Sequence, residues 1–384
     1  MKKFITRDIA FVAAVLLIPA GLFLFVGPQK HKRVTVYARI IGIEDNTEIM
    51  GTYLKVGEQK VTACVLRGPF QGRKIIVDND LVGNLMLDRF IEVGDRAIFS
   101  LDLEEGVIRE AELVDFDRQS WHLIMFVIFA MLLILFARHT GVKALVSFIF
   151  TVAVLVKILL PAVLKGYDPL LLCLSLAGLV ASVTLLLVSG FSIRTLAAMV
   201  GVMIGMVLAA GLTVLAGKGI RLEGMASEHS LILLFSGYPY LNLDRIFWGA
   251  VILGASGAMV DVAIAIATAV EQVVKANPSL GARKLIQSGF EVGRAALGTM
   301  VTTLLLAYAG CSLFLLLVFD AKETHLARIL NYNFVSAEIL RILAGSIGML
   351  MVAPITAVIA GVLYHRIYGS KVRIENSYRL EDVN

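Results

Sequence analysis

The chain has 384 residues, of which 58% are hydrophobic and only 17% are charged, and its formal net charge is +5. Its mean hydropathy of +0.83 excludes an ordinary soluble domain and predicts a polytopic membrane protein. The basic residues cluster beside apolar runs rather than on an aromatic-interleaved face, so the positive charge indicates membrane orientation and argues against a nucleic-acid partner.

The first element is an apolar segment with a basic start, MKKFITR. No small-residue cleavage site follows it, so residues 1–27 are expected to form an uncleaved signal-anchor helix. Seven further runs are long enough to cross a bilayer, which predicts about eight spans. The apolar runs cover roughly residues 9–27, 120–137, 144–164, 169–189, 195–216, 246–269, 297–319 and 338–363.

Residues 28–118 differ sharply in composition from the rest of the chain. Segments such as RVTVYARIIGIED and RKIIVDND alternate apolar and polar residues between turns that contain glycine. This alternation predicts short strands of a small β-barrel, either OB-like or SH3-like, because closure removes exposed strand edges.

Lysine and arginine are concentrated on one side of the predicted spans. With a cytoplasmic amino terminus, the inner segments hold more of these residues than the short outer loops. Both termini are therefore expected in the cytoplasm and residues 28–118 outside it. Residues 119–370 form the expected seven-span domain, and 371–384 form a cytoplasmic tail.

Asp261 lies inside the sixth predicted span. A carboxylate at this depth is expensive to bury, so it indicates a function rather than packing. Successive steps of three or four residues from Asp261 give the residues that share its helix face, and they are small: Ala250, Gly254, Gly257, Ala258, Ala265 and Thr268. Such a face predicts close approach of another helix.

The expected partner is the seventh span, which carries a face of small and hydroxylated residues. Gly298, Thr299, Thr302, Thr303 and Gly310 lie in it. We expect the three threonines to form a hydrated proton relay with Asp261, and Gly254, Gly257, Gly298 and Gly310 to support helix packing. The alternative is that the threonines bond their own backbone carbonyls and that Asp261 is a packing residue.

Four more residues are candidates for a supporting role at this site. Glu271, Arg294, Ser256 and Tyr308 are candidate supporting residues.

No phosphate loop, zinc-type His/Glu spacing or nucleophile elbow is present in the sequence, and the three cysteines are isolated. No enzyme activity, cofactor or metal site is therefore expected.

The chain resembles the YibE/F family of multispanning membrane proteins. The resemblance rests on LDRIFWGAVILGASGAMVDVAIAIATAVEQ, on SGFEVGR at 288–294 and on GTMVTTLLLAYAG at 298–310. It implies a bacterial inner-membrane protein with a signal anchor, an outer β domain and seven further spans, and it leaves the activity open.

A weaker, mechanistic resemblance is to the central helix pair of the RND and SecD/SecF superfamily. The order GAMVD, a basic loop and then GTMVTT is similar to the acidic helix and the threonine-bearing helix of those proteins. It implies a proton-carrying role for Asp261, with Thr302 or Thr303 as the neighbouring hydroxyl. A single acid without a relay lysine departs from the drug-pump pattern.

These patterns favour a proton-coupled secondary transporter, most simply an exporter, of an unknown small solute or ion. The alternative is a non-transporting scaffold or envelope-biogenesis factor whose β domain docks a partner. In both cases the lipid bilayer surrounds the spans, and a homo-oligomer is one candidate assembly.

Overall fold

A computed structural model of the chain describes residues 11–15, 17–19, 21, 33–50, 54–68, 70–84, 88–104, 107–222, 224 and 228–381. The chain divides into two compact units. One unit lies within residues 27–136 and holds the β-strands. The other holds the helices from residue 137 onward together with the short amino-terminal helical stretch.

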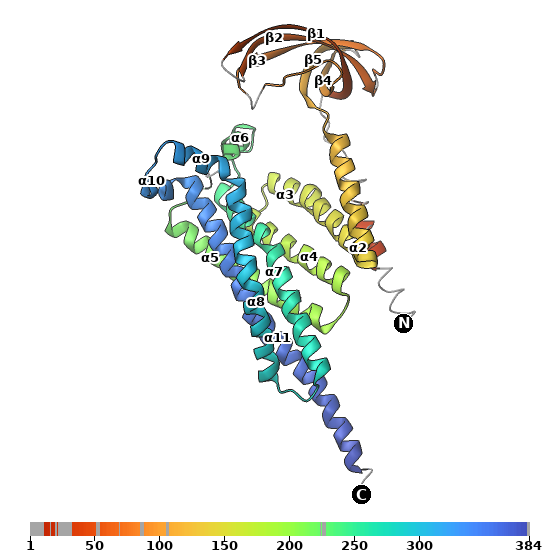
Figure 1. Cartoon of the computed structure of the whole chain (residues 1–384), viewed down its shortest axis with the longest axis vertical. Helices are drawn as coiled ribbons and strands as arrows, with labels where there is room; N and C mark the ends of the chain where they lie inside the picture. The colour runs from red at the N-terminus through yellow and green to blue at the C-terminus, as the bar shows by residue number, and fades with distance from the viewer. Residues whose placement is uncertain are drawn as a thin grey trace. The chain divides into compact units, whose positions relative to one another are not determined.

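The strand unit contains a five-stranded antiparallel sheet (Figure 1). Its strands pair in the order β3-β2-β1-β4-β5, and β3 also contacts β5. The sheet is therefore nearly closed into a barrel. The strand bounds are β1 Arg33–Met50, β2 Leu54–Arg67, β3 Lys74–Val82, β4 Arg96–Glu104 and β5 Val107–Phe116.

The alternation of apolar and polar residues produces the two faces of this sheet. Along β3, Ile75, Val77 and Leu81 are buried while their neighbours are exposed. The inner face packs around Phe99, which is fully buried. Gly57 has φ +134°, and a Cβ atom there would lie 2.6 Å from the carbonyl oxygen of Asn46, so only glycine fits. The predicted small β-barrel is confirmed as a nearly closed antiparallel sheet.

The remaining elements are helices, six of which are long and apolar enough to cross a membrane within the described part of the chain. The first runs continuously over Gln119–Leu164 and comprises α2, the π-helical η1 and α3. The bounds are α2 Gln119–Val154, η1 Leu155–Leu159, α3 Leu160–Leu164, α4 Pro169–Ser189, α5 Ile193–Gly219, α6 Glu228–Phe235, α7 Leu243–Ala276, α8 Ala282–Cys311, α9 Leu313–Ala321, α10 Leu326–Asn331 and α11 Asn333–Glu381.

Short polar residues start several of these helices. The Asp168 carboxylate accepts a hydrogen bond from the Leu171 amide at 3.0 Å at the start of α4. Ser192 caps α5 and Asn242 caps α7 in the same way. Each cap satisfies an amide that has no partner inside its own helix.

The helices differ from the predicted spans in three places. The runs 120–137 and 144–164 belong to one helix that is kinked at Arg138, where φ is 49°. The run 297–319 is divided at Ser312, and α8 begins well before it, at Ala282. The first run, 9–27, lies mostly outside the described residues. The prediction of about eight spans therefore stays a prediction.

The centre of the helical unit is α7, which contacts α4, α5, α8 and α11 (Figure 1). Its buried side carries Ile252, Met259, Ile266 and Val270, spaced at helical intervals. Asp261 lies on the opposite side of α7, away from this core.

Candidate functional site

Asp261 lines a cavity of about 480 Å³ in the helical unit. The walls come from the second half of α2, from η1, from α4 and from α7. Three of these elements supply hydroxyl groups, from Ser147, Thr151, Thr184 and Ser256. Gly254 and Gly257 also line the cavity, so no side chain from those positions fills it.

The hydroxyls around the cavity are already ordered by hydrogen bonds. Ser147 Oγ and Thr184 Oγ1 lie 2.6 Å apart and join α2 to α4. Thr151 donates to the Ser147 carbonyl at 2.8 Å, and Ser256 donates to the Leu253 carbonyl at 2.7 Å. Asp261 itself makes no hydrogen bond or ion pair within the described residues, so its oxygens face the open space.

The predicted threonines lie elsewhere. Thr299, Thr302 and Thr303 are exposed on the side of α8 that faces away from the core. Thr299 donates to the Ala296 carbonyl and Thr303 to the Thr299 carbonyl, each at 3.1 Å. No α8 residue lines the cavity of Asp261. In the structure the acid therefore shares its cavity with hydroxyls of α2 and α4, and the relay through α8 stays an untested prediction.

The four glycines expected to support helix packing differ in their surroundings. A Cβ atom on Gly254 would lie 2.8 Å from the Tyr308 hydroxyl, so α8 approaches α7 there. A Cβ atom on Gly257, Gly298 or Gly310 would meet nothing within 4 Å in this chain, and their packing role stays a prediction. The close contacts are made instead by Gly201, Gly205, Gly289, Gly348 and Gly361.

The proposed supporting residues separate into different places. Glu271 is mostly buried and bridges Arg194 at 3.2 Å and Lys275 at 2.8 Å, at the far end of α7 from Leu243. Arg294 is exposed and takes part in no ion pair among the described residues. Ser256 lines the cavity of Asp261, and Tyr308 lines a different cavity.

Sequence reasoning missed the α2 and α4 hydroxyls because they lie far from Asp261 along the chain. Their signal in the sequence is the set of hydroxyl residues within the apolar runs 144–164 and 169–189. Lys157 lies in the π-helical turn η1 but does not line this cavity.

No group of three or more His, Cys, Asp or Glu residues comes together in the described parts of the chain. The cavity offers one carboxylate and several hydroxyls, a set that suits a proton, water or a small polar solute.

Comparison with known proteins gives one match. A family model described as YibE/F-like protein matches residues 125–366, which include all of α4 to α10 and the cavity around Asp261. None of the curated proteins and none of the solved structures compared with the chain match it. The similarity to the RND superfamily gains no support from these comparisons.

Proposed function

The chain belongs to the YibE/F-like family of membrane proteins, and from that premise we propose that it is a proton-coupled secondary transporter, working as an exporter. Asp261 is the proton-carrying acid. The observation that carries the proposal is the cavity of about 480 Å³ that this carboxylate shares with hydroxyls from α2 and α4. An ionisable group inside a membrane span is costly, so its presence beside a largely apolar cavity that holds several hydroxyl groups favours a role in moving a proton.

The arrangement suggests how protonation changes the helix packing. A charged Asp261 needs water or hydroxyl donors, which keeps the space between α7 and the α2–α4 pair hydrated. A neutral Asp261 loses most of that requirement, and α7 then packs more closely against α4. The two glycines beside it leave room for this movement. Alternation between the two packings would open and close a path.

The same proposal sets the orientation. We place the protein in the bacterial inner membrane with both termini in the cytoplasm and the β domain outside, because the basic residues favour the inner segments.

We also propose an OB-like barrel for residues 28–118. The strand order, with β3 against β5, is consistent with the five-stranded Greek-key arrangement of that fold.

The test is proton flux in vesicles that contain the full-length protein. Purified wild-type protein is reconstituted, a pH gradient is imposed, and internal pH is followed with a trapped dye while candidate solutes are added. Asp261→Asn should reduce solute-dependent proton flux to the rate of empty vesicles, because the amide cannot exchange the proton. Asp261→Glu should keep part of the flux.

A matched control is Asp320→Asn, which changes an exposed carboxylate on α9. It should leave the flux unchanged. Gel filtration and thermal melting of each variant exclude misfolding as the cause of a loss. Full solute-dependent flux in folded Asp261→Asn protein would overturn the proposal.

The second candidate function is a scaffold whose β domain docks a partner, and the separate folding core of that domain favours it. In that case deletion of residues 34–116 destroys the cellular function while Asp261→Asn is harmless. The transporter proposal expects the opposite sensitivity for Asp261.

A further inference from the structure

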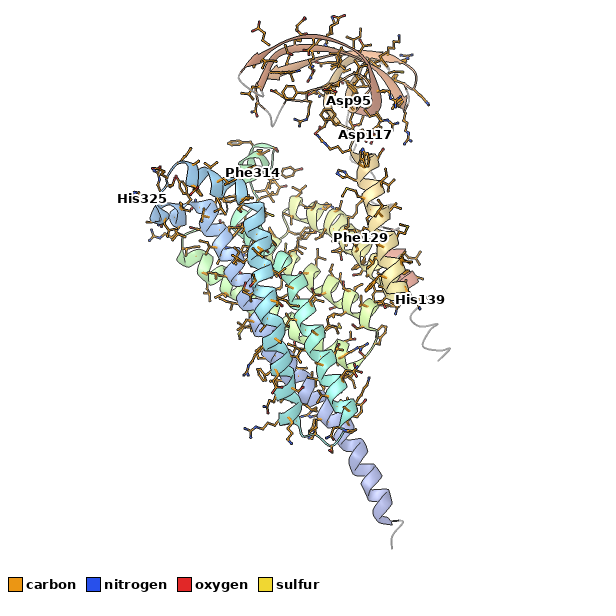
Figure 2. All side chains as sticks on the ribbon, in the orientation of Figure 1. Asp95, Asp117, Phe129, His139, Phe314 and His325 are labelled. Carbon is orange, nitrogen blue, oxygen red and sulfur yellow. The ribbon has the colours of Figure 1, made fainter. Side chains whose placement is uncertain are left out.

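A second cavity, of about 500 Å³, lies at the end of the helical unit where α7 and α11 begin. Its walls come from α6, α7, α8 and α11. Figure 2 shows the side chains of Phe314 on α9 and His325 near α10 at this same end of the bundle. This cavity does not include Asp261 and takes no part in the proton step proposed above.

Arg341 is the cation of this cavity, and its donor groups are largely unused. Its nearest carboxylate oxygen, on Glu338, lies 3.6 Å from Nη1, which is too long for a hydrogen bond. Its Nε atom is buried, and Arg341 makes no hydrogen bond within the described residues. Four of the five N–H donors of a guanidinium lie on its two Nη atoms, so Arg341 has donors left for an anion beside its ion pair with Glu338.

Two aromatic rings hold the guanidinium in place. The guanidinium carbon lies 5.6 Å from the ring centre of Phe247 and 5.8 Å from that of Tyr308. Stacking of this kind favours the planar, weakly hydrated guanidinium and leaves its edges available for a ligand. Arg341 is thereby oriented before any ligand arrives.

The rest of the lining is mainly apolar, with Leu233, Leu243, Ile246, Ala250, Phe334 and Ala337. An apolar pocket with one fixed cation suits a ligand that has an apolar body and one anionic head group. Glu338 offsets part of the charge of Arg341, so the site suits a ligand with one negative charge better than a ligand with two. A carboxylate matches the forked geometry of arginine by two parallel hydrogen bonds.

From this geometry we propose that the cavity binds an amphipathic monocarboxylate, with its carboxylate on Arg341 and its apolar body against Phe247 and Phe334. Binding at this site does not depend on transport. The identification of the bound acid as the exported solute rests on the function proposed above.

The walls of this cavity and of the Asp261 cavity are connected through α7 and Tyr308. Ala250 lines the Arg341 cavity, and Gly254, one helical turn further along α7, lines the Asp261 cavity. The Tyr308 ring lines the first cavity, and its hydroxyl lies against Gly254. A ligand that moves Tyr308 would therefore change the contact between α7 and α8 beside the acid.

The experiment measures binding to the purified full-length protein in lipid nanodiscs, with three probes of equal size: 2-naphthoate, 2-naphthalenemethanol and 2-naphthylmethylammonium. The intrinsic fluorescence of the naphthyl ring reports binding. We expect saturable binding of 2-naphthoate, with an affinity at least about tenfold above that of the neutral and the cationic probe.

Three variants locate the site. Arg341→Gln combined with Glu338→Gln removes both charges and should weaken 2-naphthoate about tenfold while changing the neutral probe little. Glu338→Gln alone frees Arg341 and should strengthen 2-naphthoate about threefold, a gain that misfolding cannot produce. Arg328→Gln is the matched control, because Arg328 also stacks on a tyrosine, Tyr332, but does not line the cavity.

Equal affinity for the carboxylate and the ammonium probe, or unchanged 2-naphthoate affinity in the double variant, would overturn this assignment. Binding that follows the expected pattern while the pH-gradient assay shows no Asp261-dependent flux would support the site and overturn the transport function. The carboxylate site at Arg341 and the transport function of Asp261 can therefore be refuted independently of each other.

Discussion

Within the helices of this bundle, some glycines lie where a neighbouring helix leaves no room for a Cβ atom and others do not. On α8, a Cβ on Gly289 would lie 2.8 Å from the Ala357 Cβ and 3.2 Å from its Cα, whereas Gly298 has nothing within 4 Å. The two positions therefore give a matched pair in one helix. Gly289 permits the close contact of α8 with α11, whereas Gly298 makes no such contact in this chain.

Gly289→Ala should lower stability by about 1–3 kcal/mol, because the methyl group forces α8 away from α11. Gly298→Ala should leave stability unchanged or raise it by up to about 1 kcal/mol, because alanine favours the helix. Thermal unfolding of both variants in the same detergent checks this. A larger loss in Gly298→Ala would show that this position packs against something, such as a second copy of the chain.

Asp261 illustrates what a single residue's sequence context can and cannot predict. A charge within an apolar helix is visible in the sequence, and helical periodicity identifies its neighbours on α7. Periodicity does not say which other helix covers that face. Ser147 of α2 and Thr184 of α4, which line the same cavity as Asp261, lie far from it along the chain, so no periodicity within α7 indicates them.

At the scale of one strand, Asp115 of β5 forms ion pairs with two arginines outside that strand. Its carboxylate contacts Arg89 Nε at 3.1 Å and an Arg118 guanidinium nitrogen at 2.9 Å. Partial burial disfavours the charged form, but the hydrogen bond from Arg118, the Phe116 amide and the charge of Arg89 outweigh it. They hold the pKa of Asp115 below its ordinary value.

A pKa lower in the folded than in the unfolded state means that ionised Asp115 stabilises the fold above its unfolded pKa, near 4. This stability is lost as the pH falls through the folded pKa. Asp115→Asn should therefore destabilise the β domain by about 1 kcal/mol at pH 7 and by less at pH 3. Chemical unfolding of the full-length protein, followed by a probe in the sheet, measures this; an equal loss at both pH values would contradict it.

Element boundaries show where sequence patterns stop being informative. Hydropathy located the long helices, but it started α8 too late and missed the division at Ser312. The chain continues as α8 through residues 282–296, because packing against α11 favours a helix there. The kink at Arg138 falls in the interval between the predicted runs 120–137 and 144–164, but hydropathy does not show that the helix continues across it. The β domain was easier to predict, because each strand alternates clearly.

For the molecule as a whole, the family match and the six apolar helices establish a membrane protein, whereas its orientation rests on charge alone. The proposed orientation puts Lys74 of β3 outside the cytoplasm and Arg283 of α8 inside it. Both side chains are exposed, so each position can carry a reporter without disturbing the core.

The test replaces Cys64 and Cys311 by serine and leaves Cys173, which is buried in the helical unit. Lys74→Cys or Arg283→Cys is then added, and intact spheroplasts are treated with a membrane-impermeant maleimide. The β-domain cysteine should react at once, and the α8 cysteine should react only after the membrane is permeabilised, because the basic residues beside α8 are retained on the cytoplasmic side. Labelling in the reverse order would show that the protein has the opposite orientation in the membrane. The proposed export would then have to be uptake, and the Arg341 cavity would lie at the cytoplasmic end of the helices.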